Sequence, residues 1–548
     1  MVTAARAIVE CLLREGVDHI FGIPGTQNLP LIDALRDTPA IRYVLTRHEQ
    51  GAAFMAYGFA RASGRPGIVT STEGPGVTNL VTGIAAAYKG FVPVISLCGI
   101  QEDFVRERDA NQDIDQTSLF RPITRWAYSI PSAHKAQESM RKAFRVALSH
   151  PTGPVHIDTS RDVFLEETEL EDIAPAAYRT ESLPNCPESL LNEVVKLMER
   201  AERPLFVVGG GVLKEGLIGE MQHLAELTQI PVAALQYSPD AFPSTHSLAL
   251  GPLGRNGWAS ANHAAPRADL IVAIGAHIDV YSTTFRYGVI SREAKLVHHA
   301  VSPSDIGVVY PVALGLSGST RSFVEGLTAR LESAGRTWPW LDVPKARADW
   351  DAERFGEVNA EAVPIASQYL AATMRKVLPR DGMMILDAGN AGKHMRVYFD
   401  TYEGGTFMSI DDWASVGGAF PIGLGAKLAR PERPVMCTVG DMGMMCNIGE
   451  IETAVREHIP VVCVVYNDQG LGNERAYQNE LYGGRQYAVD YGDVDFAALA
   501  RTLGAFGERV TDPADLEPAL HRALASNQPA IVDVVIDQGT LAPVVFHP

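Results

Sequence analysis

Two acidic residues, Asp441 and Asp468, are the strongest candidates for chemistry in this sequence. Each stands two positions after the end of a β-rich run, Val435–Val439 in one case and Val461–Tyr466 in the other. If both runs are parallel strands, their carboxyl ends lie at the edge of the sheet where open α/β proteins bind ligands. Mg²⁺ usually binds one or two carboxylates together with substrate phosphates. The pattern therefore predicts a cation site, although Gly, Asp and Asn are also ordinary turn residues after strands.

Glycines accompany both acidic residues and extend the prediction to a phosphate. Gly440, Gly443, Gly470 and Gly472 allow the backbone to approach a ligand closely. A helix expected over about Asn447–Glu457 would offer its N-terminus to an anion.

A third acidic residue, Glu49, joins a predicted strand end to a predicted helix. Small apolar residues follow it in the segment Thr46–Ala53, and an apolar environment would raise the pKa of its carboxyl group. The alternative is an ordinary first-turn Glu stabilised by the helix dipole. The segment is not a zinc-protease motif, because HEQGA lacks the second His of HExxH.

These residues require a framework of parallel strands, and the sequence predicts one. Short β-rich runs alternate with helical patterns almost throughout, which predicts an α/β fold with three doubly wound parallel-sheet domains. The predicted domains are residues 1–165, 188–335 and 360–548, with an acidic, proline-containing linker after the first and a Trp- and Pro-rich connector, Arg336–Asp351, after the second. The best-defined predicted strands are His19–Phe21, Tyr43–Thr46, Gly67–Thr72, Val92–Cys98, Pro154–Ile157, Pro204–Gly209, Leu270–Ile274, Met383–Leu386, Val435–Val439, Val461–Tyr466 and Ala530–Val535.

Composition limits the classes of partner. The net charge is −18, with 47 Lys plus Arg against 65 Asp plus Glu, which argues against nucleic acid or an anionic membrane surface. The six cysteines form no CxxC pair, and no apolar run approaches the ~20 residues of a membrane span. The N-terminal segment is predicted to be an amphipathic helix capped by Thr3 rather than a signal peptide, so we expect a cytoplasmic protein.

The acidic motifs together resemble the thiamine diphosphate enzymes. Gly440-Asp441-Met442 followed by Asn467-Asp468 is similar to that family's metal and diphosphate fingerprint. The resemblance implies that Asp441, Asp468 and the carbonyl group of Gly470 hold Mg²⁺, and that Glu49 activates the cofactor through its aminopyrimidine ring. Met442 replaces a Gly of the family pattern. Asp468 replaces a commoner Asn, which adds a negative charge and leaves open whether Asn467 or Asp468 is the metal ligand.

Further segments resemble acetolactate synthase, benzaldehyde lyase and benzoylformate decarboxylase. They are Phe21–Thr26, Gly74–Asn79, Gln112 with its neighbours, and Phe120–Trp126. The resemblance implies pyrimidine-binding, central and diphosphate-binding domains, in that order. It also implies a site between two subunits, so that the protein would be at least a homodimer and commonly a homotetramer.

The resemblance assigns roles residue by residue. The residues of this chain that the resemblance implies to be catalytic are Glu49 and Gln112. Its cofactor-binding residues are Thr72, Gly389, Asn390, Val416, Gly440, Asp441, Met442, Gly443, Asn467, Asp468, Gly470, Leu471 and Gly472. Its substrate-facing residues are Gly25, Thr26, Gln27, Glu73 and Asn473, of which Glu73 stands where acetolactate synthases have Ser.

The function implied is carbon–carbon bond chemistry that depends on thiamine diphosphate and Mg²⁺. A 2-oxo acid would lose CO₂, and its acyl unit would pass to an aldehyde or ketone, as in acetolactate synthase. The alternatives are a simple decarboxylase or aldehyde lyase, a flavin-linked 2-oxo acid oxidase, and a non-catalytic relative. FAD in the central domain is disfavoured, because Gly209-Gly210-Gly211 is not GxGxxG and Ala276–Val280 lacks the arginines of the flavin-binding segment.

Overall fold

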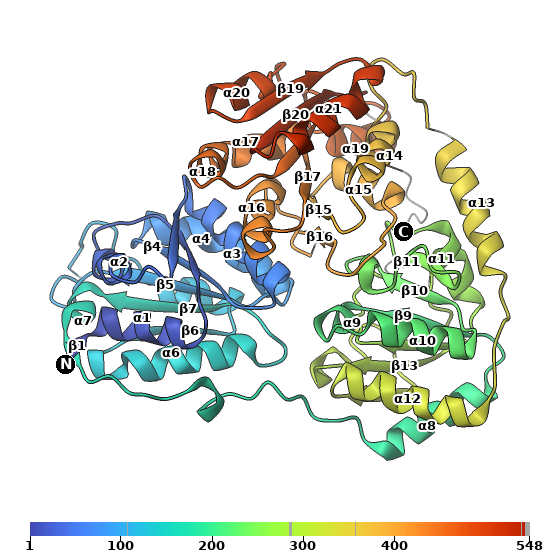
Figure 1. Ribbon diagram of the computed structural model, residues 1–548, viewed down its shortest axis with the longest axis horizontal. Coiled ribbons are helices and arrows are strands. Elements are labelled where there is room, and N and C mark those ends of the chain that lie inside the picture. Colours follow the sequence, from blue (N-terminus) through green and yellow to red (C-terminus); the bar gives the residue numbers. More distant parts are fainter. Residues whose placement is uncertain (107, 284–287, 357, 411, 539, 543–548) are drawn as a thin grey trace.

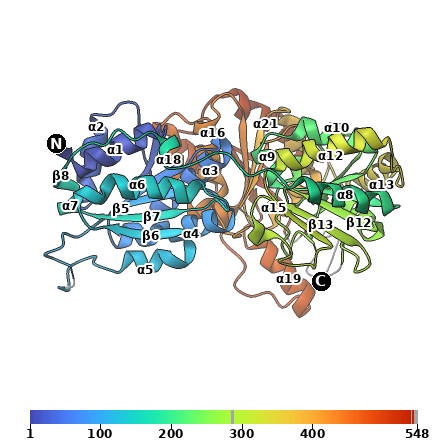
Figure 2. The ribbon, with the colours of Figure 1, turned by 90° about the horizontal axis from the view of Figure 1, so that it is seen from below.

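Three six-stranded parallel sheets form the framework of the chain. The computed structural model describes residues 1–106, 108–283, 288–356, 358–410, 412–538 and 540–542. Figure 1 shows the first sheet at the left, the central sheet at the right and the third above them, and Figure 2 shows the first and central sheets again at opposite ends. Each predicted domain range contains one of these sheets, which confirms the predicted fold class.

The first sheet has the strand order β3-β2-β4-β5-β7-β6. Its strands are β2 (His19–Gly22), β3 (Arg42–Leu45), β4 (Gly67–Ser71), β5 (Val94–Ile100), β6 (Trp126–Ile130) and β7 (Val155–Ser160). Its helices are α1 (Ala4–Arg14), α2 (Leu29–Arg36), α3 (Glu49–Ser63), α4 (Pro75–Lys89), α5 (Gln116–Phe120), α6 (Ala133–Leu148) and α7 (Arg161–Leu165).

The third sheet repeats this topology with the order β16-β15-β17-β18-β20-β19. Its strands are β15 (Met383–Leu386), β16 (Phe407–Ser409), β17 (Val435–Gly440), β18 (Val462–Asn467), β19 (Phe506–Val510) and β20 (Ala530–Val535). Its helices are α14 (Ser367–Val377), α15 (Asn390–Tyr398), α16 (Ala419–Ala429), α17 (Asp441–Cys446), α18 (Glu450–Arg456), α19 (Gly472–Tyr482), α20 (Phe496–Thr502) and α21 (Pro513–Ala525). In both sheets the second strand in sequence lies at one edge, beside the first.

The central sheet has a different order, β11-β10-β9-β12-β13-β14, in which the chain runs outward in both directions from β9 and β12. Its strands are β9 (Pro204–Val208), β10 (Val232–Leu235), β11 (Ala249–Leu253), β12 (Leu270–Ile274), β13 (Lys295–Ala300) and β14 (Leu314–Ser317). Its helices are α8 (Glu188–Arg200), α9 (Gly210–Lys214), α10 (Ile218–Thr228), α11 (Ala259–Ala264), α12 (Thr320–Ala334) and α13 (Val343–Gly356).

Both faces of the sheets are buried, as the near-continuous apolar strands predict. In the central sheet, Phe206 and Val208 contribute to one core and Leu205 and Val207 to another, because successive side chains point to opposite faces. The first and third sheets share one core between them. It contains Val69 of β4 and Val465 of β18 in a single cluster.

Helices α3 and α16 join the first sheet to the third, and they lie side by side in Figure 1. Each follows the second strand of its own sheet. Their backbones approach so closely that a Cβ on Gly58 would collide with the carbonyl oxygen of Ile422, and a Cβ on Gly425 with that of Met55. Glycine at these two positions therefore permits the contact between the sheets.

Most predicted strands agree with the structure to within two residues, and Thr3 caps α1 as expected by accepting a hydrogen bond from the amide of Arg6. Three regions differ. The linker contains a strand, β8 (Glu167–Thr168), which pairs with β1 (Val2–Thr3), and the connector contains α13, which buries Trp350. The helix predicted over Asn447–Glu457 begins only at Glu450, because the chain first forms α17 directly after β17.

No helix in the described parts of the chain combines the length and the apolar character needed to cross a membrane.

Candidate active site

The strand ends of the third sheet bring the predicted metal residues together. Strands β17 and β18 are hydrogen-bonded neighbours, with Gly440 opposite Tyr466. The amide of Gly470 donates to Asp441 Oδ2 at 2.9 Å, and the amide of Met442 donates to Oδ1 at 2.6 Å. The loop after β18 is thus tied to the carboxylate after β17, as the sequence predicts for neighbouring parallel strands.

The structure distinguishes Asn467 from Asp468. The amide group of Asn467 is used inside the protein, where Nδ2 donates to Asp533 Oδ1 at 2.9 Å and to the carbonyl oxygen of Val494 at 3.0 Å. The carboxylate of Asp468 instead interacts electrostatically with Asp441. Of the two residues left open by the sequence, Asp468 is thus the one whose side chain interacts with Asp441.

The electrostatics of this pair suit a divalent cation. Burial raises the pKa of Asp441 to about 6. Burial and then the charge of Asp441 raise the pKa of Asp468 to about 7. Two buried carboxylates that oppose each other's ionisation are stabilised in the charged form by a cation between them. The residues present therefore fit a divalent metal with oxygen ligands.

Two of the glycines predicted to approach the cofactor, Gly389 and Gly440, border open space. A Cβ on Gly440 or on Gly389 would meet no atom within 4 Å, so neither glycine is required by packing, although Gly389 also has a positive φ of 97°. Helix α15 begins at Asn390 and helix α19 at Gly472, and both N-termini can attract an anion.

Two predicted cofactor residues have surroundings that the sequence did not show. The side chain of Asn390 is bonded to the C-terminal segment, since Nδ2 donates to the carbonyl oxygen of Thr540 at 2.6 Å and Oδ1 accepts from the amide of Ala542 at 3.0 Å. Val416 is 37% exposed although it precedes two buried glycines. An exposed apolar side chain at this turn fits the proposed support of a cofactor.

Asp387 organises the site and has no assigned role in the sequence analysis. It is fully buried and accepts hydrogen bonds from the amides of Gly417, at 2.8 Å, and Ala419, at 3.2 Å. Its carboxylate also occupies the place where a Cβ on Gly443 would lie. Asp387 therefore connects the end of β15, the turn before α16 and the start of α17. Its position in the turn Asp387–Asn390 was the available signal.

The remaining predicted residues of the third sheet surround the same loop. Met442 and Leu471 are half-buried. Asn473 accepts a hydrogen bond at Oδ1 from Lys393 Nζ, at 2.6 Å, and Lys393 also donates to the hydroxyl group of Tyr477 at 3.2 Å. Lys393 thus adds a positive charge that the sequence analysis did not identify.

Glu49 begins helix α3 and is 8% exposed. Asn79 Nδ2 donates to its Oε2 at 2.9 Å. A Cβ on Gly76 would lie 3.3 Å from Oε1, so the glycine leaves room beside that oxygen. The preceding residue, His48, caps the helix by accepting from the amide of Gln50 at 3.1 Å. The prediction of a buried carboxylate at this strand–helix junction agrees with the structure.

Three of the predicted substrate-facing residues lie near Thr72, which is predicted to bind the cofactor. Thr72 Oγ1 donates to Gln27 Oε1 at 2.6 Å, and a Cβ on Gly25 would collide with the Thr72 side chain. Thr26 is exposed between them. The structure therefore places these residues in one group at the carboxyl ends of β2 and β4.

Glu73, predicted to be substrate-facing, has no exposed surface in the structure. The amide of Gln101 covers it and donates to Oε1 at 3.1 Å, while Oε2 has no hydrogen-bond partner among the described residues. Burial raises the pKa of Glu73 to about 7. Gln112, predicted to be catalytic, has a positive φ of 73° and packs against the backbone of Gly74.

Glu450 links the two groups of residues within one chain. It starts α18, is 1% exposed, and accepts hydrogen bonds from the amides of Arg47, at 3.1 Å, and His48, at 3.0 Å. Burial raises its pKa to about 6. The third unit therefore holds the turn that presents Glu49. Sequence reasoning missed Glu450, because its partners are some 400 positions away in the chain.

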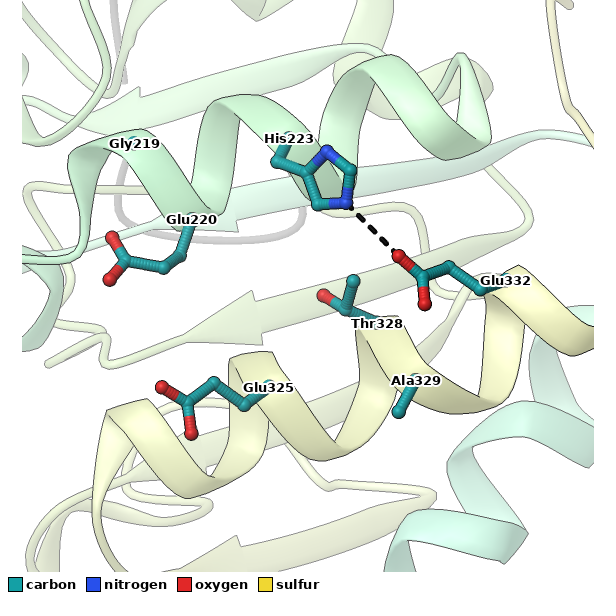
Figure 3. Close-up of a pocket in the computed structure, with 7 residues that line it drawn as sticks. All are labelled: Gly219, Glu220, His223, Glu325, Thr328, Ala329 and Glu332. Atoms are coloured by element: carbon teal, nitrogen blue, oxygen red, sulfur yellow. Dashed lines mark hydrogen bonds and ion pairs between the residues drawn. The ribbon is translucent and has the colours of Figure 1, made fainter.

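The central sheet contributes neither group. Gly209 and Gly211 are explained by packing, because a Cβ on either would lie 2.7 Å from atoms of the turn after β12. An open groove between α10 and α12 is shown in Figure 3, where His223 faces Glu332 with 3.2 Å between Nε2 and Oε1. This groove contains none of the predicted site residues.

Comparisons with known proteins cover almost the whole chain. Residues 2–119 match the N-terminal TPP binding domain of thiamine pyrophosphate enzymes, residues 191–327 match the central domain, and residues 387–534 match the C-terminal TPP binding domain. A probable acetolactate synthase large subunit of Methanocaldococcus jannaschii is 34% identical, over 99% of this chain and 93% of the relative. The large subunit of acetolactate synthase isozyme 3 of Escherichia coli is 30% identical, over 98% and 95%. A sulfoacetaldehyde acetyltransferase of Alcaligenes xylosoxydans is 31% identical, over 95% and 90%.

Proposed function

Because the chain belongs to the thiamine pyrophosphate enzyme family, we propose that it is a carboligase that takes its acyl unit from a 2-oxo acid. The acid, for example pyruvate, would lose CO₂, and the acyl unit would form a new bond to a second carbonyl group. The relatives named for acetolactate synthesis and for acetyl transfer support this choice over simple decarboxylation.

One observation carries the proposal. A buried glutamate stands at a strand end of the first sheet, and a buried pair of aspartates stands at strand ends of the third, whose topology is the same. Thiamine diphosphate needs these two functions separately, since its ring must exchange a proton and its diphosphate must be held by a metal. When bound, the cofactor supplies the carbon nucleophile that attacks the substrate carbonyl group.

The chain's own residues would then have distinct roles. Glu49 would hold a proton between its carboxylate and the cofactor ring, with Asn79 fixing the orientation of the carboxyl group. Asp441, Asp468 and the carbonyl group of Gly470 would bind the divalent metal, for which we propose Mg²⁺. Val416 would contact the cofactor from below, and Gln27 and Gln112 would contact the substrate.

We further propose that each site forms between the first unit of one subunit and the third unit of another, so that the working enzyme is at least a homodimer. This proposal follows the family resemblance; within one chain, Glu450 of the third unit contacts the backbone before Glu49 and leaves its carboxylate to Asn79.

The test is product analysis after incubation with pyruvate, glyoxylate or benzoylformate, with and without aldehyde acceptors. We expect an acyloin or acetohydroxy acid that forms only with thiamine diphosphate and Mg²⁺ present. Free aldehyde as the sole product would favour a decarboxylase. A yellow protein that consumes O₂ would favour the flavin-linked oxidase.

A further inference from the structure

Asp468 has a buried cationic partner. Arg475, in the first turn of α19, is 3% exposed, and its Nη1 donates to Asp468 Oδ2 at 3.2 Å. Its Nη2 donates to Asp490 Oδ1 at 2.9 Å. The side chain of Asp490 is 73% exposed, so water screens its charge. Asp468 is therefore the buried carboxylate that Arg475 neutralises.

The loop is shaped around this ion pair. A Cβ on Gly470 would collide with Arg475 Nη2, and a Cβ on Gly472 would collide with Asp468 Oδ2. The carbonyl group predicted to bind the metal belongs to Gly470, and Gly472 follows two positions later. A Cβ on Gly470 would also meet the carbonyl oxygen of Val489, so the loop is packed closely around the buried pair.

The charges at the site then balance in a specific way. Asp441 and Asp468 together carry two negative charges, and Arg475 returns one positive charge within hydrogen-bond distance of Asp468. The three side chains therefore carry a total charge of −1. An aspartate paired with a neutral asparagine, which is the combination that the resemblance leads us to expect, also carries −1. In a buried site an uncompensated additional charge would repel a diphosphate strongly.

We propose that Arg475 is a charge-compensating residue of the cofactor site, which allows an aspartate at position 468 to bind a metal–diphosphate group in place of an asparagine. This inference rests on the proposed function. Arg475 acts through Asp468 and is therefore a positioning residue. Its Nη1 lies 3.2 Å from Asp468 Oδ2, so its positive charge offsets the negative charge of that carboxylate.

A purely structural role must be separated from this one. Arg475 also helps to hold the segment around Asp490 against the loop, where Leu471 and Tyr491 make backbone hydrogen bonds of 2.7 Å to Val489 and Gln469. Asp490→Asn removes the charge of the second partner of Arg475 and leaves Asp468 paired. It is therefore the matched control for a role of Arg475 as a clamp that only holds the segment around Asp490 against the loop.

The experiment measures thiamine diphosphate binding to the full-length protein by calorimetry at saturating Mg²⁺. We expect Arg475→Met to weaken binding by about tenfold or more, since it leaves Asp468 uncompensated. Asp468→Asn should bind within about threefold of the unaltered protein, and the double variant Asp468→Asn with Arg475→Met should recover most of the lost affinity. Asp490→Asn should bind like the unaltered protein. High salt should reduce the defect of Arg475→Met.

Equal weakness of Arg475→Met and of the double variant would overturn the proposal, because a clamp or a direct phosphate contact predicts no rescue. Unchanged affinity in Arg475→Met would overturn it as well. If Arg475→Met does not fold, two other variants still allow thiamine diphosphate affinities to be compared. The double variant buries no unpaired charge, and Arg475→Lys keeps the positive charge. Failure of the unaltered protein to bind the cofactor would instead contradict the proposed function.

Discussion

The first and third sheets have the same strand order, yet their strand ends carry different chemistry. In both sheets the second strand leads into a helix, α3 or α16, and these two helices pack on each other. Helix α3 opens with the carboxylate of Glu49, whereas the turn before α16 carries the exposed Val416 and two glycines. The topology therefore fixes where a strand end lies, and the side chain placed there decides what it can bind.

The same contrast holds at the third strand of each sheet. Strand β4 leads to Glu73, which is enclosed and has one oxygen without a described partner. Strand β17 leads to Asp441, which interacts electrostatically with Asp468 and Arg475. If the proposed function is right, the two sheets supply a proton-exchanging half and a metal-binding half, and changes in each should have different consequences.

The largest effect should come from Glu49→Gln. Because the amide cannot exchange the proton that the carboxyl group would hold, we expect turnover to fall by about 100-fold or more. Cofactor affinity measured by calorimetry should stay within a few-fold. The control is Glu138→Gln on the exposed surface of α6. Full turnover in Glu49→Gln with added cofactor would remove Glu49 from the proposed chemistry.

Asp441→Asn should produce the opposite pattern in the third sheet. Loss of one metal-binding carboxylate should weaken thiamine diphosphate binding about 10- to 100-fold, with partial recovery at high Mg²⁺. Asp349→Asn, on the exposed side of α13, is the matched control. A loss of turnover with unchanged affinity would show that the two halves are not divided as we describe.

Gly58→Ala should test the contact that joins the two sheets. Its methyl group would collide with the carbonyl oxygen of Ile422, so we expect the free energy of unfolding to fall by about 3 kcal/mol, measured by urea denaturation. Gly219→Ala in α10 is the control, because a Cβ there meets nothing within 4 Å and alanine favours the helix by about 0.5–1 kcal/mol. Equal stability of the two variants would contradict the close packing.

Glu73→Gln should give the smallest change, and only at higher pH. The folded protein holds the Glu73 proton more tightly than the unfolded chain, since the pKa rises from 4.5 to about 7. The stabilisation is therefore complete below about pH 4.5 and is lost as the pH rises through about 7. At pH 8 the neutral amide should raise the free energy of unfolding relative to Glu73, by at most about 3 kcal/mol, and at pH 4.5 the two should be similar.

The Asp441 and Asp468 pair provides the comparison for Glu73. Their raised pKa values should give the metal-free protein a similar loss of stability with rising pH. Mg²⁺ with thiamine diphosphate should reverse this loss in the third sheet and leave the contribution of Glu73 unchanged. Chemical denaturation at several pH values, with and without these ligands, separates the two.

Local sequence patterns predicted much of the fold. Strands such as Leu270–Ile274, Met383–Leu386 and Ala530–Val535 have the predicted bounds, because apolar runs between turn residues specify buried parallel strands without distant information. The helix inside the connector was missed, since its Trp and Pro residues obscure the helical pattern that Trp350 completes by burial. The common topology of the first and third sheets was not visible, because strand order leaves no periodic trace in the residues.

The sequence by itself determined which side chains stand at strand ends, since that depends on the few residues after each apolar run. It thereby identified Glu49, Asp441 and Asp468. The tertiary structure alone decided that Asp468 rather than Asn467 lies beside Asp441, and that Arg475 pairs with it. It also decided that Asp387 and Glu450 hold the surrounding turns. The partners of these residues are fixed by packing between segments far apart in the chain. Burial in the folded protein, and not spacing along the sequence, decides which charged groups must be paired.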